Sequence, residues 1–179
     1  MAETPNMQIW IGRAVYVGIC FLLIFLQLMP LDARPEIIPW PDLLLLVTLI
    51  WVARRPDYTP VIAIAALFFL TDLLFQRPPG LWTALVIILT ESLRKRANQL
   101  RNAPAALEWG SIALGIVAIT LAYRAILFVA LTPAPPLGLT LIQMAITILS
   151  YPVVAILAHY LFGVSRPTPG AIDSLGHRL

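Results

Sequence analysis

Charged side chains are scarce in this chain. Of its 179 residues, 12% are Asp, Glu, Lys or Arg, whereas 60% are hydrophobic. A soluble domain carries roughly a quarter charged residues, because its surface must face water. The scarcity excludes an ordinary soluble domain and predicts a protein whose surface faces lipid.

Signals for catalysis and for cofactor binding are also lacking. Cys20 is the only cysteine, so no disulfide can form within the chain, and the two histidines do not stand at a metal-ligand spacing. The sequence has no glycine-rich phosphate loop. Ser111 lacks the surroundings of a nucleophile, such as Gly-x-Ser-x-Gly. We therefore predict a protein that is not an enzyme and that holds neither a metal nor another cofactor.

No polar stretch is long enough to form a second domain, and apolar runs occupy most of the chain. A helix needs about 20 apolar residues to cross the hydrocarbon core of a membrane. The expected spans are residues 13–31, 41–53, 59–75, 80–93, 107–131 and 137–162. We therefore predict an all-α membrane protein with about six transmembrane helices in one domain (residues 1–164), followed by a short polar cytoplasmic tail (residues 165–179). The second and fourth runs are short, which leaves five spans as the alternative.

Basic residues are unevenly divided between the two sides of the predicted bundle. Nine lie on one side: Arg13, Arg54, Arg55, Arg94, Lys95, Arg96, Arg101, Arg166 and Arg178. The other side holds two, Arg34 and Arg77, and Arg124 lies inside the fifth run. This positive-inside bias predicts a multi-pass protein with both termini in the cytoplasm. The net charge of +3 thus indicates membrane orientation rather than binding to nucleic acid.

Several residues fit ordinary roles near the ends of the spans. Asp42 follows a proline, as expected for an acid at the positive end of a helix, although a functional role is an equal alternative. Glu91 precedes Arg94 by three residues, which predicts a local ion pair on one helix face. Trp40 and Trp51 bracket the second run, so both are expected to anchor it at the membrane interfaces.

Polar residues at membrane depth are costly and need an explanation. At 1.5 Å per residue, Asp72 lies about 7 Å and Arg124 about 12 Å short of the outer ends of their spans. The long arginine stem closes the difference, so we predict that the two meet. Gln27, Asp42 and Gln143 fall at similar depth, so five polar groups should gather toward the external side. They form either an ion pair that fixes helix register or a polar cavity or docking surface.

Two segments carry a resemblance to a known family. Residues 38–46 read IPWPDLLLL, and residues 70–74 read LTDLL, with a PPGL turn at 78–81. Both resemble the rod shape-determining protein MreD family, in which an Asp-Leu-Leu precedes a turn like Pro-Leu-Gly. The turn here, Pro-Pro-Gly, is a small departure. Size and span layout are similar over residues 9–163. Asp42 and Asp72 occupy positions of the family's motif, whereas Arg124 does not.

The resemblance implies a non-enzymatic subunit of the bacterial cell-elongation complex in the cytoplasmic membrane. It implies MreC as the partner and, through MreC, the actin-like MreB and the wall-building glycosyltransferase and transpeptidase. The family is also similar in fold to the substrate-binding components of vitamin transporters. A small-molecule binding subunit of a transporter is therefore the alternative. Stacking aromatic residues would favour it, and we expect few of them in the outer half.

Overall fold

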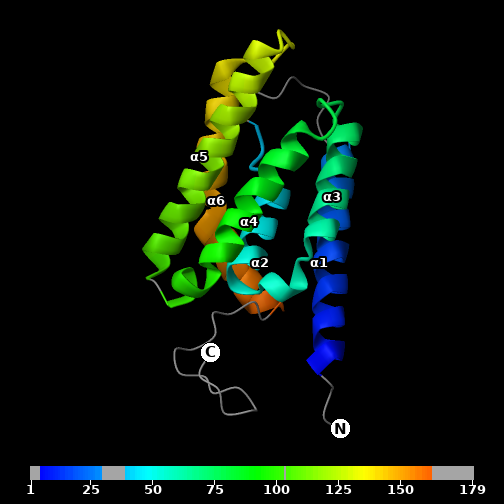
Figure 1. Ribbon diagram of the computed structural model, residues 1–179, viewed down its shortest axis with the longest axis vertical. Helices are drawn as coiled ribbons and strands as arrows, with labels where there is room; N and C mark the ends of the chain where they lie inside the picture. The colour runs from blue at the N-terminus through cyan, green and yellow to red at the C-terminus, as the bar shows by residue number, and fades with distance from the viewer. Residues whose placement is uncertain (1–4, 30–38, 103, 163–179) are drawn as a thin grey trace.

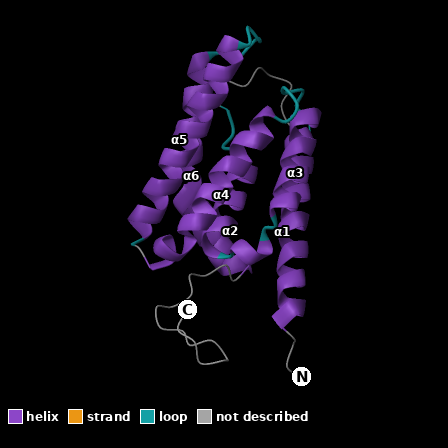
Figure 2. Ribbon diagram, in the orientation of Figure 1, coloured by secondary structure: helices purple, strands orange, loops and turns teal. Residues whose placement is uncertain are grey.

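A computed structural model describes residues 5–29, 39–102 and 104–162 (Figure 1). Within these ranges the secondary structure is entirely helical, as Figure 2 shows, in agreement with the predicted all-α class. The helices are α1 (Pro5–Leu28), α2 (Leu43–Arg54), the short 3-10 helix η1 (Pro56–Tyr58), α3 (Val61–Leu74), α4 (Leu81–Asn102), α5 (Ala105–Val129) and α6 (Leu137–Phe162). The predicted polar tail, residues 165–179, lies outside the described residues.

Successive helices run in opposite directions. Figure 1 shows that α1 begins and α6 ends at the same end of the bundle, which is lower in that view. We call this the lower end. At the upper end, α1 ends, α2 begins, and the turns from α3 to α4 and from α5 to α6 are made.

Among the described residues, three helices are long and apolar enough to cross a membrane: Met7–Leu28, Ala105–Val129 and Leu137–Tyr160. They support the prediction of a helical membrane protein. The helices α2 and α3 are apolar but have only 12 and 14 residues. At 1.5 Å per residue they are about 18 and 21 Å long, less than the hydrocarbon thickness. A count of six full spans therefore remains a prediction.

The short helix α2 forms the centre of the bundle. Residues 44–53 are all buried, and α2 packs against α1, α4 and α6. A helix that is apolar all round belongs inside the protein, which explains how so short a segment is accommodated. The predicted interfacial role of Trp51 is wrong. Its side chain is only 2% exposed, and its ring lies 6.3 Å from that of Tyr16, because neighbouring helices enclose this end of α2.

The helix α4 continues to Asn102, nine residues beyond the predicted end of the fourth span. Its last turns carry polar and basic residues that form helices well in water. The predicted local ion pair in α4 is confirmed, with Arg94 Nε 2.9 Å from Glu91 Oε1. The same guanidinium donates to the carbonyls of Pro56 and Thr59, at 2.9 and 2.6 Å. Arg94 therefore fastens the turn between α2 and α3 to α4.

Candidate functional site

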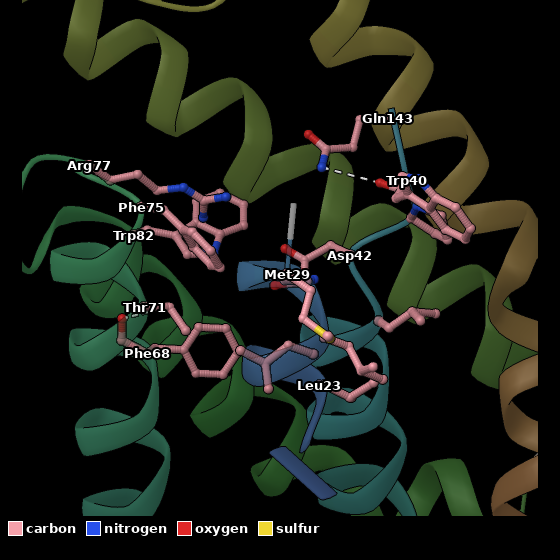
Figure 3. A pocket seen from close by; sticks show the side chains of 15 residues that line it. Leu23, Met29, Trp40, Asp42, Phe68, Thr71, Phe75, Arg77, Trp82 and Gln143 are labelled. Carbon is pink, nitrogen blue, oxygen red and sulfur yellow. Dashed lines mark hydrogen bonds between the residues drawn. The ribbon is translucent and has the colours of Figure 1, made fainter. Parts of the chain in front are cut away.

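Two adjoining cavities lie at the upper end of the bundle. The larger, which we call the upper cavity, has a volume of about 490 Å³ (Figure 3), and the smaller, the side cavity, about 310 Å³. Both volumes fall in the usual range for ligand pockets, roughly 300–1,000 Å³. The two share five lining residues: Asp42, Phe75, Arg77, Trp82 and Gln143.

The upper cavity has a polar side and an apolar side. Figure 3 shows Asp42, Arg77 and Gln143 toward one side, with Leu23 and Phe68 toward the other. The apolar side chains come from α1, α2 and α3, whereas Asp42 and Arg77 stand in connections between helices and Gln143 stands in α6. This arrangement suits a ligand with a polar head and an apolar body.

Asp42 has the structural role that its sequence position indicates. Its Oδ1 accepts a hydrogen bond from the backbone N–H of Leu45 at 2.9 Å, which caps the start of α2. Its own N–H donates to the Thr147 hydroxyl at 3.0 Å, linking α2 to α6. The neighbouring Gln143 amide donates to the Trp40 carbonyl at 3.3 Å. These bonds hold the entry segment of α2 against α6.

Arg77 is a site residue that the sequence analysis missed, since it was counted only among the arginines of one side. Its guanidinium carbon lies 5.5 Å from the Phe75 ring centre and 5.7 Å from that of Trp82. Such stacking is a cation–π interaction. The guanidinium makes no hydrogen bond or ion pair with a described residue. Its proximity to two aromatic residues in a proline turn was the signal available in the sequence.

The predicted pair of Asp72 and Arg124 does not form. Asp72 Oδ2 accepts hydrogen bonds from Gly80 N, Thr83 N and Thr83 Oγ1, at 3.0, 3.2 and 2.8 Å. Arg124 Nη1 donates to the Thr140 hydroxyl at 2.7 Å and to the Pro135 carbonyl at 3.0 Å. Asp72 therefore caps α4, whereas Arg124 fastens the turn from α5 to α6.

Depth along the membrane was the wrong criterion for that pair. The helix α3, which carries Asp72, packs against α1 and α4, whereas α5 packs against α4 and α6. Two residues at the same height can face different neighbours. In addition, the backbone N–H groups at the start of α4 have no partners within that helix, so they can bind the Asp72 carboxylate. They also lie closer to Asp72 along the chain than Arg124 does.

The five polar residues singled out from the sequence are distributed over three places. Gln27, Asp42 and Gln143 line the upper cavity, where Gln27 is exposed. Arg124 lines the side cavity together with Asp42 and Gln143. Asp72 is fully buried behind the turn and lines neither cavity. Its Oδ1 has no partner among the described residues.

Aromatic residues are more numerous at the upper cavity than expected. Trp40, Phe68, Phe75 and Trp82 line it, and Tyr123 in the side cavity meets Trp82 edge-on at 5.3 Å between ring centres. The expectation of few aromatic residues at this depth is therefore wrong. Three of the four stand in or beside proline-rich connections, which the folded chain turns back toward the cavity.

Trp82 also has an unused hydrogen-bond donor. Its side chain is only 8% exposed, it lines both cavities, and its indole N–H has no partner among the described residues. A buried polar group without a partner costs free energy unless a water or ligand satisfies it. The site thus offers donors from Arg77 and Trp82 and a carboxylate from Asp42.

A second polar cluster, at the lower end, was not predicted. Arg54 Nε lies 3.0 Å from Glu108 Oε1, and the Tyr151 hydroxyl donates to the same oxygen. Arg54 Nη1 also donates to the Ala155 carbonyl at 3.2 Å. Glu108 is only 2% exposed. This lower cluster joins α2, α5 and α6, and the signal for it was an acidic residue at the start of a long apolar run.

Metal binding has no support in the described ranges, which contain no group of three His, Cys, Asp or Glu side chains suited to a metal ion. Comparison with known protein families, with curated proteins and with solved structures finds no match to this chain. The site must therefore be interpreted from its own geometry and from the two resembling segments.

Proposed function

We propose that this chain is a non-enzymatic subunit of the bacterial cell-elongation complex, in which it scaffolds peptidoglycan synthesis. In this proposal the protein crosses the cytoplasmic membrane six times, with both termini and the lower end of the bundle in the cytoplasm. It binds MreC, which connects it to MreB and to the wall-building glycosyltransferase and transpeptidase.

One observation carries the proposal: the two segments that resemble the MreD family meet at the upper cavity. Residues 40–44 of the first segment line that cavity. Asp72 of the second segment caps α4, which positions Trp82 in the cavity wall. Two segments that lie apart in the sequence thus contribute to one place in the bundle, since Asp42 of the first and Thr71 of the second both line the cavity.

The direct test is deletion of the gene in its own bacterium. Cells that lack the protein should become round, because wall insertion along the cylinder loses its membrane subunit, and a plasmid-borne copy should restore the rod. Recovery of MreC with the tagged protein from mild detergent would support the partner. Rod-shaped cells after a clean deletion would contradict the proposal.

A matched pair of variants tests whether the upper cavity takes part. Trp40 and Trp10 are equally exposed, at 68% each, but only Trp40 lines the cavity. Trp40→Ala should restore shape poorly, whereas Trp10→Ala should restore it fully at the same protein level. Equal restoration by both variants would separate the function from the cavity.

The orientation is tested by cysteine labelling in a Cys20→Ser background. Ala134→Cys, in the turn from α5 to α6, should react with an impermeant thiol reagent in intact cells. Gln99→Cys, near the lower end of α4, should react only after lysis. The reverse pattern would invert the proposed topology.

The aromatic lining of the upper cavity favours a second candidate function, a vitamin-binding or other small-molecule binding subunit of a transporter. Its volume and its four aromatic side chains suit a planar ligand. A deletion strain that kept its rod shape but lost uptake of one vitamin would support this candidate. Loss of shape with normal uptake would exclude it.

A further inference from the structure

The upper cavity contains one acidic and one basic side chain that attract each other at a distance but form no direct ion pair. Asp42 and Arg77 both line it, yet no ion pair joins them among the described residues. Asp42 uses Oδ1 to cap α2, and its Oδ2 accepts no hydrogen bond from a described residue. Arg77 stacks on the Phe75 and Trp82 rings, and its charge acts on Asp42 without a direct ion-pair contact. The cavity thus presents separate negative and positive groups with unused bonding capacity.

Charges near the membrane are costly unless they meet opposite charges. A ligand that satisfied both groups would carry an anion and a cation of its own. The anion would accept hydrogen bonds from the Arg77 guanidinium, with the unpartnered Trp82 N–H as a second donor. The cation would bind Asp42 Oδ2. Placed there, it would also keep the ligand's anion away from the Asp42 carboxylate.

The apolar side of the cavity adds a third requirement. Leu23, Leu26, Leu44 and Phe68 line it and offer no hydrogen bond to a ligand through their side chains. A hydrocarbon chain fits this lining. In addition, Phe25 and Leu26 of α1 are exposed, which places an apolar outer face beside the cavity wall.

We propose that the upper cavity binds an aminophospholipid, with its phosphate at Arg77 and Trp82, its primary ammonium at Asp42 and one acyl chain along Leu23, Leu44 and Phe68. The second chain stays in the bilayer. This inference goes beyond the role in cell elongation and does not rest on it.

A primary ammonium fits better than a quaternary one. The Asp42 oxygen can accept a hydrogen bond from an N–H, which a choline group lacks. Proteins bind quaternary ammonium groups within cages of aromatic rings. Here two of the rings, Phe75 and Trp82, are already occupied by the Arg77 guanidinium. The cavity should therefore select ethanolamine over choline.

The test uses the purified full chain in detergent, with native mass spectrometry and thermal stabilisation as two readouts. The probes are dioctanoyl forms of phosphatidylethanolamine, phosphatidylcholine and phosphatidylglycerol. Phosphatidylethanolamine should bind about tenfold more tightly than the other two, the gain from one added charge-assisted hydrogen bond. Equal binding of all three lipids would overturn the proposal.

Variants assign the two halves of the head group. Arg77→Gln should weaken binding of all three lipids about tenfold, because all carry the phosphate. Asp42→Asn retains an N-cap residue, and it should abolish only the preference for ethanolamine over choline. Trp82→Phe keeps a ring and removes the N–H, so it should weaken binding about threefold. Glu91→Gln, at the lower end, is the control and should leave lipid binding unchanged.

Two further outcomes are decisive. If Arg77→Gln and Asp42→Asn bind lipid like the unaltered protein, the bound lipid is adventitious and the assignment fails. Soluble phosphoethanolamine carries the same head without a chain. If it binds as tightly as the lipid, the ligand is a small polar molecule and the lipid assignment fails. Neither result affects the shape test, so failure here is distinguishable from failure of the proposed function.

Discussion

The two ends of the bundle use their polar side chains differently. At the lower end, Glu108 accepts from both Arg54 and Tyr151, and Arg94 joins Glu91 to two carbonyls of the neighbouring turn. At the upper end, Arg77, the Trp82 N–H and one oxygen of Asp42 have no such partners among the described residues. Polar groups that satisfy one another hold helices together, whereas unsatisfied groups beside a cavity are available for binding.

The largest expected effect falls on the buried pair of the lower cluster. Glu108→Ala leaves Arg54 without its carboxylate, and Arg54→Ala leaves a buried anion. Loss of one partner of a buried pair costs about 3–5 kcal/mol of stability. The double variant Arg54→Met with Glu108→Leu should recover most of that loss, because it leaves no lone charge.

Thermal unfolding in detergent measures this prediction. The matched control is Glu91→Ala, which removes a more exposed acid from a local pair and should cost less than about 1 kcal/mol. If Glu108→Ala and Glu91→Ala lost equal amounts of stability, the buried cluster would contribute no more than the surface pair, and the prediction would be wrong.

The second effect concerns Asp72, whose removal leaves hydrogen-bond donors at the start of α4 without an acceptor. Asp72→Ala should lower stability by about 1–3 kcal/mol, since Thr83 and Gly80 lose their buried acceptor. Arg124→Ala should add its own smaller loss independently, because the two residues share no partner. A double variant more stable than the sum of the single losses would show that Asp72 and Arg124 interact after all.

A smaller effect is expected from Arg94, which bridges α4 to the turn before α3. Arg94→Lys keeps the charge but cannot reach Glu91 and two carbonyls at once. It should cost about 1 kcal/mol, the value of one or two hydrogen bonds, here partly buried ones. Lys95→Ala, at the exposed neighbouring position, is the control. An unchanged melting temperature for Arg94→Lys would mean that the bridge contributes nothing.

The smallest effect on stability should come from Arg77. Its substitution gives the clearest test of the difference between the two ends in how their polar groups are bonded. Arg77→Gln removes no hydrogen bond or ion-pair contact with a described residue, and the stacking on two rings that it loses is worth about 0.5–1 kcal/mol at a partly exposed site. Its loss should instead appear in lipid binding. If Arg77→Gln destabilised the protein as strongly as Arg54→Ala, the upper end would be a structural cluster like the lower one.

Local features of the site were predictable because they depend on neighbours in the chain. Asp42 caps α2 as its place after a proline indicates, and Glu91 pairs with Arg94 one turn away. Asp72 could also have been recognised, since it stands eight residues before Gly80 and eleven before Thr83 at the next helix start. Depth along the membrane instead predicted a pair with Arg124, a cation on a helix that does not pack against α3.

Composition and the spacing of apolar runs determined the helical class and the approximate limits of the helices, because a segment that crosses lipid must satisfy its backbone hydrogen bonds internally, as a continuous helix does. Tertiary structure alone decided which helix faces which. It buried α2 at the centre and enclosed Trp51. It also turned Trp40, Phe75 and Arg77 from the connections into one cavity. Rotation of a helix about its axis leaves its hydropathy unchanged, so only packing against specific neighbours could fix these contacts.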